Sequence, residues 1–249
     1  MSALHNGKIF RYIFSLLALA VFIQGVSGQQ NRDRKPPVQQ THKKTVKKKK
    51  SEPQPLLRAV TVQADVAGPF ISKLQGSGIS YFEASLDVNL RNKWFPVWEI
   101  GHASINHVVD EGGLFNAKGL YNRIGIDVNL LSVTNPKQIT PSILYVGVRF
   151  GFAPFNYDIH NLPLKDEYWG SNTITNLDNL KSTAKWGEFV AGIRLNVLKN
   201  VTLGWSGRLK MGLSTGKESY KPWYVPGYGI TGGAVWGFTY NVGYTIPLK

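Results

Sequence analysis

The sequence predicts an all-β protein, an antiparallel up-and-down transmembrane β-barrel of eight strands. Three observations predict it. Apolar and polar residues alternate with a period of two along most of residues 60–246, the polar faces carry acids and bases in equal number among glycines, and short links alternate with longer ones. After residue 28, no apolar stripe with the period of about 3.6 residues typical of a helix competes with this alternation.

Composition excludes several other classes of protein. The 249 residues include no cysteine, which rules out disulfides, Cys-ligated metal sites, a thiol enzyme and a Cys-anchored lipoprotein. There is no second apolar run of about 18 residues, so a membrane protein with several helices is excluded. Aromatic residues make up 12% of the chain, which is too many for a chain that is disordered throughout.

Residues 1–28 are predicted to be a secretory signal peptide. Lys8 and Arg11 precede an apolar stretch from Ile13 to Ile23, and small residues follow at Val26-Ser27-Gly28. A membrane anchor would need about 20 apolar residues, and this stretch is shorter. We therefore expect cleavage after Gly28 and export of the remaining chain.

Residues 29–55 are predicted to form a disordered basic tail. Nine Lys and Arg residues stand here against two acidic ones, and apolar residues that could build a core are almost absent. The tail therefore accounts for much of the net charge of +14. Because an exported chain rarely meets nucleic acid, this charge does not indicate nucleic-acid binding. The tail acts either as a solvated linker or as a contact with an anionic envelope polymer or lipid surface.

The remaining chain, residues 56–249, is predicted to be the barrel. Residues 82–91 show the pattern best, with Phe82, Leu86 and Leu90 on one face and Glu83, Asp87 and Arg91 on the other. Several such segments have about 10 residues, enough to cross a bilayer at a tilt. The eight segments are residues 60–66, 80–91, 94–105, 120–131, 143–152, 187–197, 201–212 and 234–246.

The polar faces of these segments predict an enclosed lumen held together by ion pairs. A soluble barrel directs charges outward, whereas a membrane barrel directs them inward. Equal numbers of acids and bases, interspersed with glycines that leave room for long side chains, suit mutual pairing in a lumen better than a water-facing sheet. The residues are Asp65, Glu83, Asp87, Arg91, Glu99, Arg123, Asp127, Arg149, Glu188, Arg194, Arg208 and Lys210.

The links between the segments predict the orientation of the barrel. They are short at residues 92–93 and 198–200, intermediate at 132–142, and longer at 67–79, 106–119, 153–186 and 213–233. Outer-membrane barrels have short periplasmic turns and longer external loops. Both termini and the basic tail are then periplasmic. Two further strands hidden in residues 153–185 would instead give a ten-stranded barrel.

At this point the chain resembles small outer-membrane barrels with the eight-stranded architecture of OmpX and the OmpA transmembrane domain. The runs EASLDVNLRNKWFPVWEIGHA, YVGVRFGF, KNVTLGWSGRLK, PWYVPGYG and WGFTYNVGYTIP are similar to those of a small barrel family of unknown function from Gram-negative envelopes. This resemblance implies a location in the bacterial outer membrane and implies no activity. The chain departs from many such barrels by ending on Pro247-Leu248-Lys249 rather than on an aromatic residue.

Two of the predicted long loops are rich in aromatic residues. One holds Phe155, Tyr157, Tyr168 and Trp169; the other holds Tyr220, Trp223, Tyr224 and Tyr228. Exposed aromatic rings beside Gly and Pro suit binding of an external protein or glycan, and they are equally typical of the interfacial girdle of a membrane barrel. The candidate binding residues are Trp169, Tyr220, Trp223, Tyr224 and Tyr228.

The sequence thus favours a non-enzymatic barrel with a plugged lumen, acting in envelope structure or in loop-mediated binding of an external partner. No catalytic residue, metal site or cofactor is expected, and membrane lipid is the expected surrounding. One alternative is an enzyme acting on lipid, an acyltransferase or deacylase; a narrow channel is the other, if there are ten strands. The residues that an enzyme or metal site would draw on are His102, Ser104, His107, Asp110, Glu111, Asp158 and His160.

Overall fold

The computed structural model describes residues 55–69, 78–108, 113–131, 141–165, 172–216 and 220–248. The predicted signal peptide lies outside these residues, as does the predicted tail apart from Pro55. Asp110, Glu111, Tyr168 and Trp169 lie outside them too. Within the described residues, no helix is long and apolar enough to cross a membrane.

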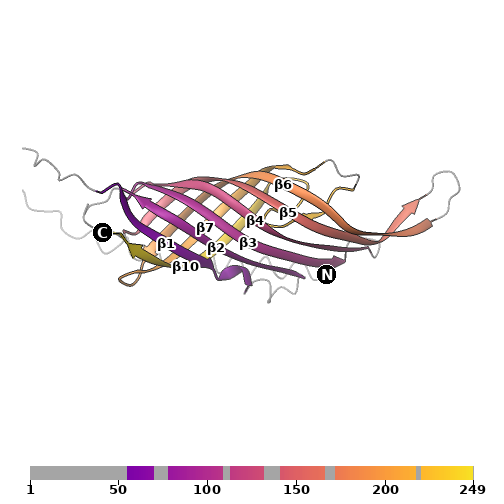
Figure 1. Ribbon diagram of the computed structural model, residues 1–249, viewed down its shortest axis with the longest axis horizontal. Helices are drawn as coiled ribbons and strands as arrows, with labels where there is room; N and C mark the ends of the chain where they lie inside the picture. The colour runs from indigo at the N-terminus through magenta and orange to yellow at the C-terminus, as the bar shows by residue number, and fades with distance from the viewer. Residues whose placement is uncertain are drawn as a thin grey trace, which may run out of the picture. The chain divides into compact units, whose positions relative to one another are not determined.

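Eight antiparallel strands close into a barrel in the order β1-β10-β7-β6-β5-β4-β3-β2. Figure 1 shows the barrel from the side, with its strands tilted along the long axis. Their bounds are β1 Leu57–Asp65, β2 Ile79–Leu90, β3 Trp94–Val108, β4 Leu114–Asn129, β5 Ile143–Lys165, β6 Asn172–Asn196, β7 Val201–Ser214 and β10 Val235–Pro247. The eight-stranded prediction is confirmed. The ten-stranded alternative is wrong, because residues 153–165 and 172–186 continue β5 and β6.

The alternation of the sequence decides which side chains face outward. On β5, Val148 and Phe150 are 48% and 49% exposed, whereas Arg149 between them is 6% exposed. The same arrangement, with apolar residues outside and charges inside, runs around the half of the barrel nearest the turns at residues 91–93 and 197–200. We call this region the belt. Its exposed residues include Val62, Phe82, Trp98, Ile124, Val148, Phe189, Trp205 and Phe238.

Four strands run beyond the belt, where sequence analysis had predicted loops at residues 106–119 and 153–186. In the structure Ala117 pairs with Tyr157, and Phe155 pairs with Ser182. The hairpin of β5 and β6 projects past the other strands in Figure 1. We call this part the extension: residues 102–108, 114–119, 153–165 and 172–185.

The extension escaped prediction because its sidedness is the reverse of the belt. Among its described side chains most inward residues are apolar, and Ile105, Phe115 and Phe155 are at most 4% exposed. Outward positions hold polar residues such as Lys118 and Asn156, both exposed. A search for strands with an apolar outer face therefore stops where the belt stops, although the period of two continues.

The first and last described strands begin and finish at the same end of the barrel, where short turns join neighbouring strands. We call it the short-turn end. Ala59 of β1 pairs with Pro247 of β10, and the links at residues 91–93 and 197–200 turn at this end. The first of these turns needs left-handed backbone at Arg91 (φ 53°) and Asn92 (φ 56°). The extension lies at the opposite end, together with the links at residues 66–78, 109–113, 166–171 and 215–234. The predicted alternation of link lengths holds only in part, because the β4–β5 link at the short-turn end, residues 130–142, is longer than the links at 109–113 and 166–171.

Candidate functional site

Glu99 of β3 stands at the centre of the lumen and contacts three guanidinium groups. Its Oε2 accepts hydrogen bonds from Arg123 Nη1 at 2.6 Å and Arg208 Nη1 at 2.8 Å, and its Oε1 accepts one from Arg149 Nε at 3.0 Å. None of these four side chains is more than 4% exposed. Charge-assisted hydrogen bonds of this kind offset the cost of removing the ions from water.

Two further carboxylates bridge the same arginines. Glu83 lies 2.9 Å from Arg123 Nη1 and 3.5 Å from Arg208 Nη2. Glu188 lies 3.0 Å from Arg123 Nε and 3.3 Å from Arg208 Nη1, and it accepts a 2.6 Å hydrogen bond from Trp186 Nε1. The middle of the lumen is thus one connected network and not a set of isolated pairs.

Two bidentate pairs continue the charge pairing. Arg149 donates from Nη1 and Nη2 to the two oxygens of Asp127 at 2.8 and 2.9 Å. Nearer the short-turn end, Arg194 pairs with both oxygens of Asp87 at 3.0 and 2.9 Å, and Gln63 Nε2 donates to Asp87 at 2.8 Å. Fork-to-fork contacts fix both side chains in place as well as neutralising them.

Aromatic rings fill much of the lumen that the charges leave, and each lies over a glycine on the neighbouring strand. A Cβ atom on any of these glycines would come within 2.2 to 2.7 Å of the facing ring, so a larger residue there would displace it. The cross-strand pairs are Gly101 with Tyr121, Gly151 with Trp186 and Gly192 with Tyr145. Sequence analysis missed these rings, and the signal that finds them is an inward glycine opposite an inward aromatic residue.

Residues 220–234, between β7 and β10, fold back into the open end of the barrel as an inserted hairpin. Its strands are β8 Tyr224–Val225 and β9 Gly229–Ile230. Pro222, Val225 and Pro226 are almost completely buried. At its tip, Gly227 has a φ of 79°, which favours glycine, and a Cβ there would stand 2.5 Å from the ring of Tyr121.

The tip of the inserted hairpin is bound by cations of the lumen. Lys210 Nζ donates to the carbonyl oxygens of Gly227 at 2.7 Å and Tyr228 at 3.1 Å, and Arg123 Nη2 donates to Gly227 at 3.4 Å. The ring of Tyr228 packs edge-on against Trp186, with centroids 5.9 Å apart. The hairpin is therefore held by polar contacts at its tip and by packing along its length.

Most residues predicted for the lumen pair with one another. They are Glu83, Asp87, Glu99, Arg123, Asp127, Arg149, Glu188, Arg194 and Arg208. Lys210 lies in the lumen but binds the inserted hairpin. Asp65 is buried at the end of β1, where its Oδ1 accepts from the backbone amides of Ala67 and Tyr240 at 3.0 and 3.1 Å. The prediction for Arg91 is wrong, because this residue lies exposed in the turn after β2.

The predicted exposure of the loop aromatics is largely wrong. Tyr224 and Tyr228 are buried in the inserted hairpin, and Phe155 and Tyr157 face the interior of the extension. Burial raises the pKa of Tyr224 to about 12, so its phenol stays protonated at physiological pH.

Two other loop aromatics are only partly covered. Trp223 stacks flat on His107, with ring centroids 4.9 Å apart. The backbone oxygen of the half-buried Tyr220 accepts a hydrogen bond of 2.6 Å from Tyr157 Oη. Trp169 lies outside the described residues. The best-described candidate binding aromatics therefore hold the hairpin in place and do not project as a contact surface.

The histidines named for an enzyme or metal site lie apart from one another. His102 is exposed on the outer wall of β3, His107 stacks on Trp223, and His160 lies 2.7 Å from Asp178 on the projecting hairpin. Asp158 accepts from the backbone amide of Asn179. In the described part of the chain, no group of three or more His, Asp or Glu side chains is placed to hold a metal ion.

Residues 9–249 match the family described as a domain of unknown function, DUF6048, and the chain belongs to this family. No curated protein matches it. Two solved structures are similar to the chain at low identity. The N-terminal β-barrel domain of Pseudomonas aeruginosa OprF is 12% identical with a TM-score of 0.34, covering 76% of this chain and 97% of that one. Neisserial surface protein A (NspA) is 10% identical with a TM-score of 0.31, covering 77% and 96%.

Proposed function

We propose that this member of the DUF6048 family is a non-enzymatic outer-membrane barrel with a closed lumen, which holds its extension outside the membrane as a rigid surface for an external partner. The observation that carries the proposal is the change of sidedness along single strands. The belt suits lipid outside, and the extension suits water outside.

The belt supports insertion into a bilayer. A ring of exposed apolar side chains in a soluble barrel would leave a large patch in water, which soluble proteins avoid. A closed barrel satisfies its backbone hydrogen bonds within the sheet, as a chain in hydrocarbon must. Because outer-membrane barrels turn tightly on the periplasmic side, we place both mature termini in the periplasm. There the basic tail can reach an anionic envelope polymer.

The filled lumen supports a closed barrel. An eight-stranded barrel has an interior that side chains just fill. Here the network around Glu99 occupies the middle, and the inserted hairpin occupies the open end. We therefore expect no steady diffusion of solutes, in contrast to the channel alternative.

The outer wall of the extension is the surface we assign to the partner, replacing the buried loop aromatics. It carries a hollow of about 490 Å³ lined by polar groups on four neighbouring strands, among them Asn106, Asn116, Lys118, Asn156 and Asp158. The amide of Asn156 donates to Asn179 Oδ1 at 3.1 Å, so this wall is ordered by its own hydrogen bonds. Amide, carboxylate and ammonium groups suit the hydroxyls of a glycan, which is our preferred partner class.

The enzyme alternative finds less support. Acyl transfer or hydrolysis would need a general base within hydrogen-bond reach of a nucleophile. Among the described residues, the three candidate histidines have only Trp223 and Asp178 as ring-stacking, hydrogen-bonding or ion-pair partners. In the part of the chain that the structure describes, no serine or threonine is hydrogen-bonded to them.

Three measurements test the proposal. The outer-membrane fraction should give a band that migrates differently before and after boiling, and the purified barrel should give no stable ohmic steps in a planar bilayer. An epitope tag inserted at residues 166–171 should be detected on intact cells, whereas a tag after residue 249 should require permeabilised cells. A soluble, unshifted band, a steady pore or the opposite tag pattern would each overturn a separate part of the proposal.

Surface binding is tested with a glycan array probed by the folded protein. Asn156→Ala and Asn116→Ala should weaken any glycan signal, and Thr183→Ala, on the neighbouring outer wall, is the matched control. Binding unaffected by the first two changes would remove the outer wall as the contact surface. Selective capture of a protein in place of a glycan would overturn the partner class.

A further inference from the structure

Among the described residues, the sheet has a break on one side, because β1 is shorter than its neighbours. The last pairs of β1 are Ala64 with Ala84 of β2 and Asp65 with Asn241 of β10. Beyond them β2 runs on to Ile79 and β10 to Val235. In the described part of the chain, these two strand ends therefore face each other without a strand between them.

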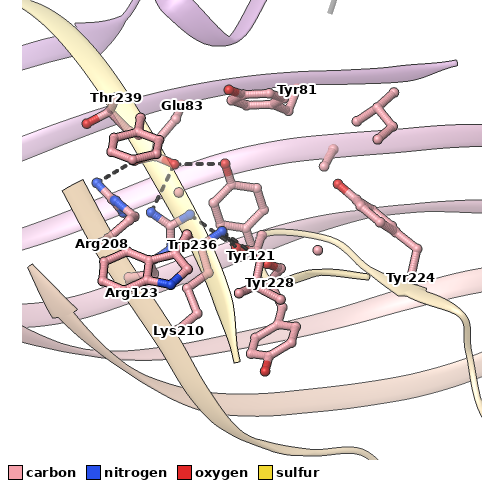
Figure 2. A pocket seen from close by; sticks show the side chains of 17 residues that line it. Tyr81, Glu83, Tyr121, Arg123, Arg208, Lys210, Tyr224, Tyr228, Trp236 and Thr239 are labelled. Carbon is pink, nitrogen blue, oxygen red and sulfur yellow. Dashed lines mark hydrogen bonds and ion pairs between the residues drawn. The ribbon is translucent and has the colours of Figure 1, made fainter. Parts of the chain in front are cut away.

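A pocket of about 220 Å³ opens at this break, and Figure 2 shows the side chains around it. Tyr81 and Glu83 line it from β2, and Gly237 and Thr239 line it from β10. The inserted hairpin closes the third side. Arg123, Arg208 and Lys210 lie at its inner end.

The outer rim of the pocket is aromatic and faces the surroundings of the belt. Trp236, the second residue of β10, is 68% exposed, and Phe238 is 48% exposed. Tryptophan concentrates at the level of lipid headgroups. In the membrane location proposed above, this places the rim where the charged part of a lipid meets its acyl chains.

Gly237 faces inward on β10 and has no side chain, so nothing from this position covers Arg208 and Lys210 at the inner end of the pocket. A Cβ atom at this position would stand 3.1 Å from Arg208 Cγ and 3.4 Å from Lys210 Cε. Any larger residue would therefore press on the stems of both side chains and narrow the pocket. The glycine keeps a path between the rim and the charged floor.

Lys210 is the cation on this floor that carries no ion pair. Arg123 and Arg208 are each paired with glutamates, whereas Lys210 Nζ contacts only the carbonyl oxygens of Gly227 and Tyr228 among the described residues. Of the three protons of an ammonium group, one is left for a further acceptor. Glu188 and Glu83 act on this charge electrostatically without reaching ion-pair distance, so an anionic group can supply the remaining acceptor.

We propose that this pocket binds the anionic headgroup of a membrane lipid, with Lys210 as the headgroup contact and with Trp236 and Phe238 against its acyl chains. Pockets that enclose a whole drug-sized ligand have about 300–1,000 Å³, so this smaller one takes one end of a molecule whose remainder stays outside. A lipid of the surrounding leaflet fits that description. The proposal rests on the membrane location proposed above.

Native mass spectrometry of the folded full chain in detergent tests the proposal, with phosphatidic acid as the anionic probe and diacylglycerol as the uncharged one. One phosphatidic acid should stay bound in preference to diacylglycerol. Lys210→Gln should lower the affinity for phosphatidic acid about tenfold, the usual effect of losing one charge-assisted hydrogen bond. Lys210→Arg should keep the preference, and Lys181→Gln, which removes an exposed charge on the extension, is the matched control.

Gly237→Leu gives an independent result, because it fills the pocket without removing a charge. It should abolish binding while the heat-modifiable band remains. Equal lipid preference in the original protein, Lys210→Gln and Gly237→Leu would overturn the pocket. Failure of the protein to insert into phosphatidylcholine vesicles, measured separately by the heat-modifiable band, would instead overturn the membrane location.

Discussion

The belt and the extension are made from the same strands with opposite sidedness. On β6, Ile193 faces outward in the belt and the inward Arg194 is 6% exposed. Ten residues earlier on the same strand, Thr183 faces outward in the extension and the inward Ala184 is fully buried. The pairing of β6 with β7 shifts register between Lys185 and Gly187, but inward and outward side chains keep alternating along β6, and the chemistry of its two faces is exchanged.

In the proposed membrane location, this exchange matches each region to its surroundings. An inward arginine in the belt is buried and needs partners, and carboxylates on the facing strands supply them. An inward alanine or phenylalanine needs only packing, and the extension can therefore leave its polar residues to water. The faces exchange near Leu120 on β4 and Phe152 on β5, and this is the level at which we place the change from lipid to water.

The largest expected loss of stability follows from removing the carboxylate of Glu99, which lies at the centre of the ion-pair network inside the belt. Glu99→Ala leaves three buried guanidinium groups with one acceptor fewer, and breaking a buried pair in this way costs about 3–5 kcal/mol. The free energy of unfolding, measured by urea titration in vesicles, should fall by that amount. An unchanged unfolding midpoint would mean that water in the lumen replaces the carboxylate.

The second prediction places the same residue on the two outer faces. Ile193→Arg should destabilise the barrel by about 2–4 kcal/mol if the site lies near the middle of the bilayer. Thr183→Arg on the same strand should change the unfolding free energy by less than about 0.5 kcal/mol, because water solvates it. Equal effects at the two positions would remove the difference in surroundings on which the comparison depends.

The comparison also explains what sequence alone could predict. The eight strands, the outward belt residues and most of the lumen charges follow from the period of two and from the count of charges on the inner face. The length of β5 and β6 does not, because an inverted strand such as residues 153–161, with Phe155 and Tyr157 inside, has the aromatic composition of a binding loop. The inserted hairpin was missed for the same reason. Its aromatic residues Tyr224 and Tyr228 have the composition of an exposed binding loop, and only their contacts with the barrel show that they are buried.

A smaller effect is expected where the inserted hairpin meets the extension. Tyr157→Phe removes the 2.6 Å hydrogen bond to the backbone oxygen of Tyr220, a loss of about 0.5–1.5 kcal/mol. Amide hydrogen exchange in residues 220–234 should become faster, while exchange in the belt strands should not. Tyr240→Phe, which removes a hydroxyl from the outer face of the belt, serves as the control and should leave the hairpin unaffected.

The smallest effect is predicted for the exposed end of the extension. His160 and Asp178 lie 2.7 Å apart, but the carboxylate side chain is 70% exposed. Pairs of this kind contribute about 0–1 kcal/mol because water and salt screen them. Asp178→Asn should therefore leave the unfolding midpoint almost unchanged, in contrast to Glu99→Gln, which makes the same chemical change inside the belt. Because the two substitutions each exchange one carboxylate oxygen for an amide group, any difference between them measures the surroundings of the carboxylate. A large loss of stability from Asp178→Asn would mean that the far end of the hairpin is covered in the assembled protein and that its polar face is not solvated.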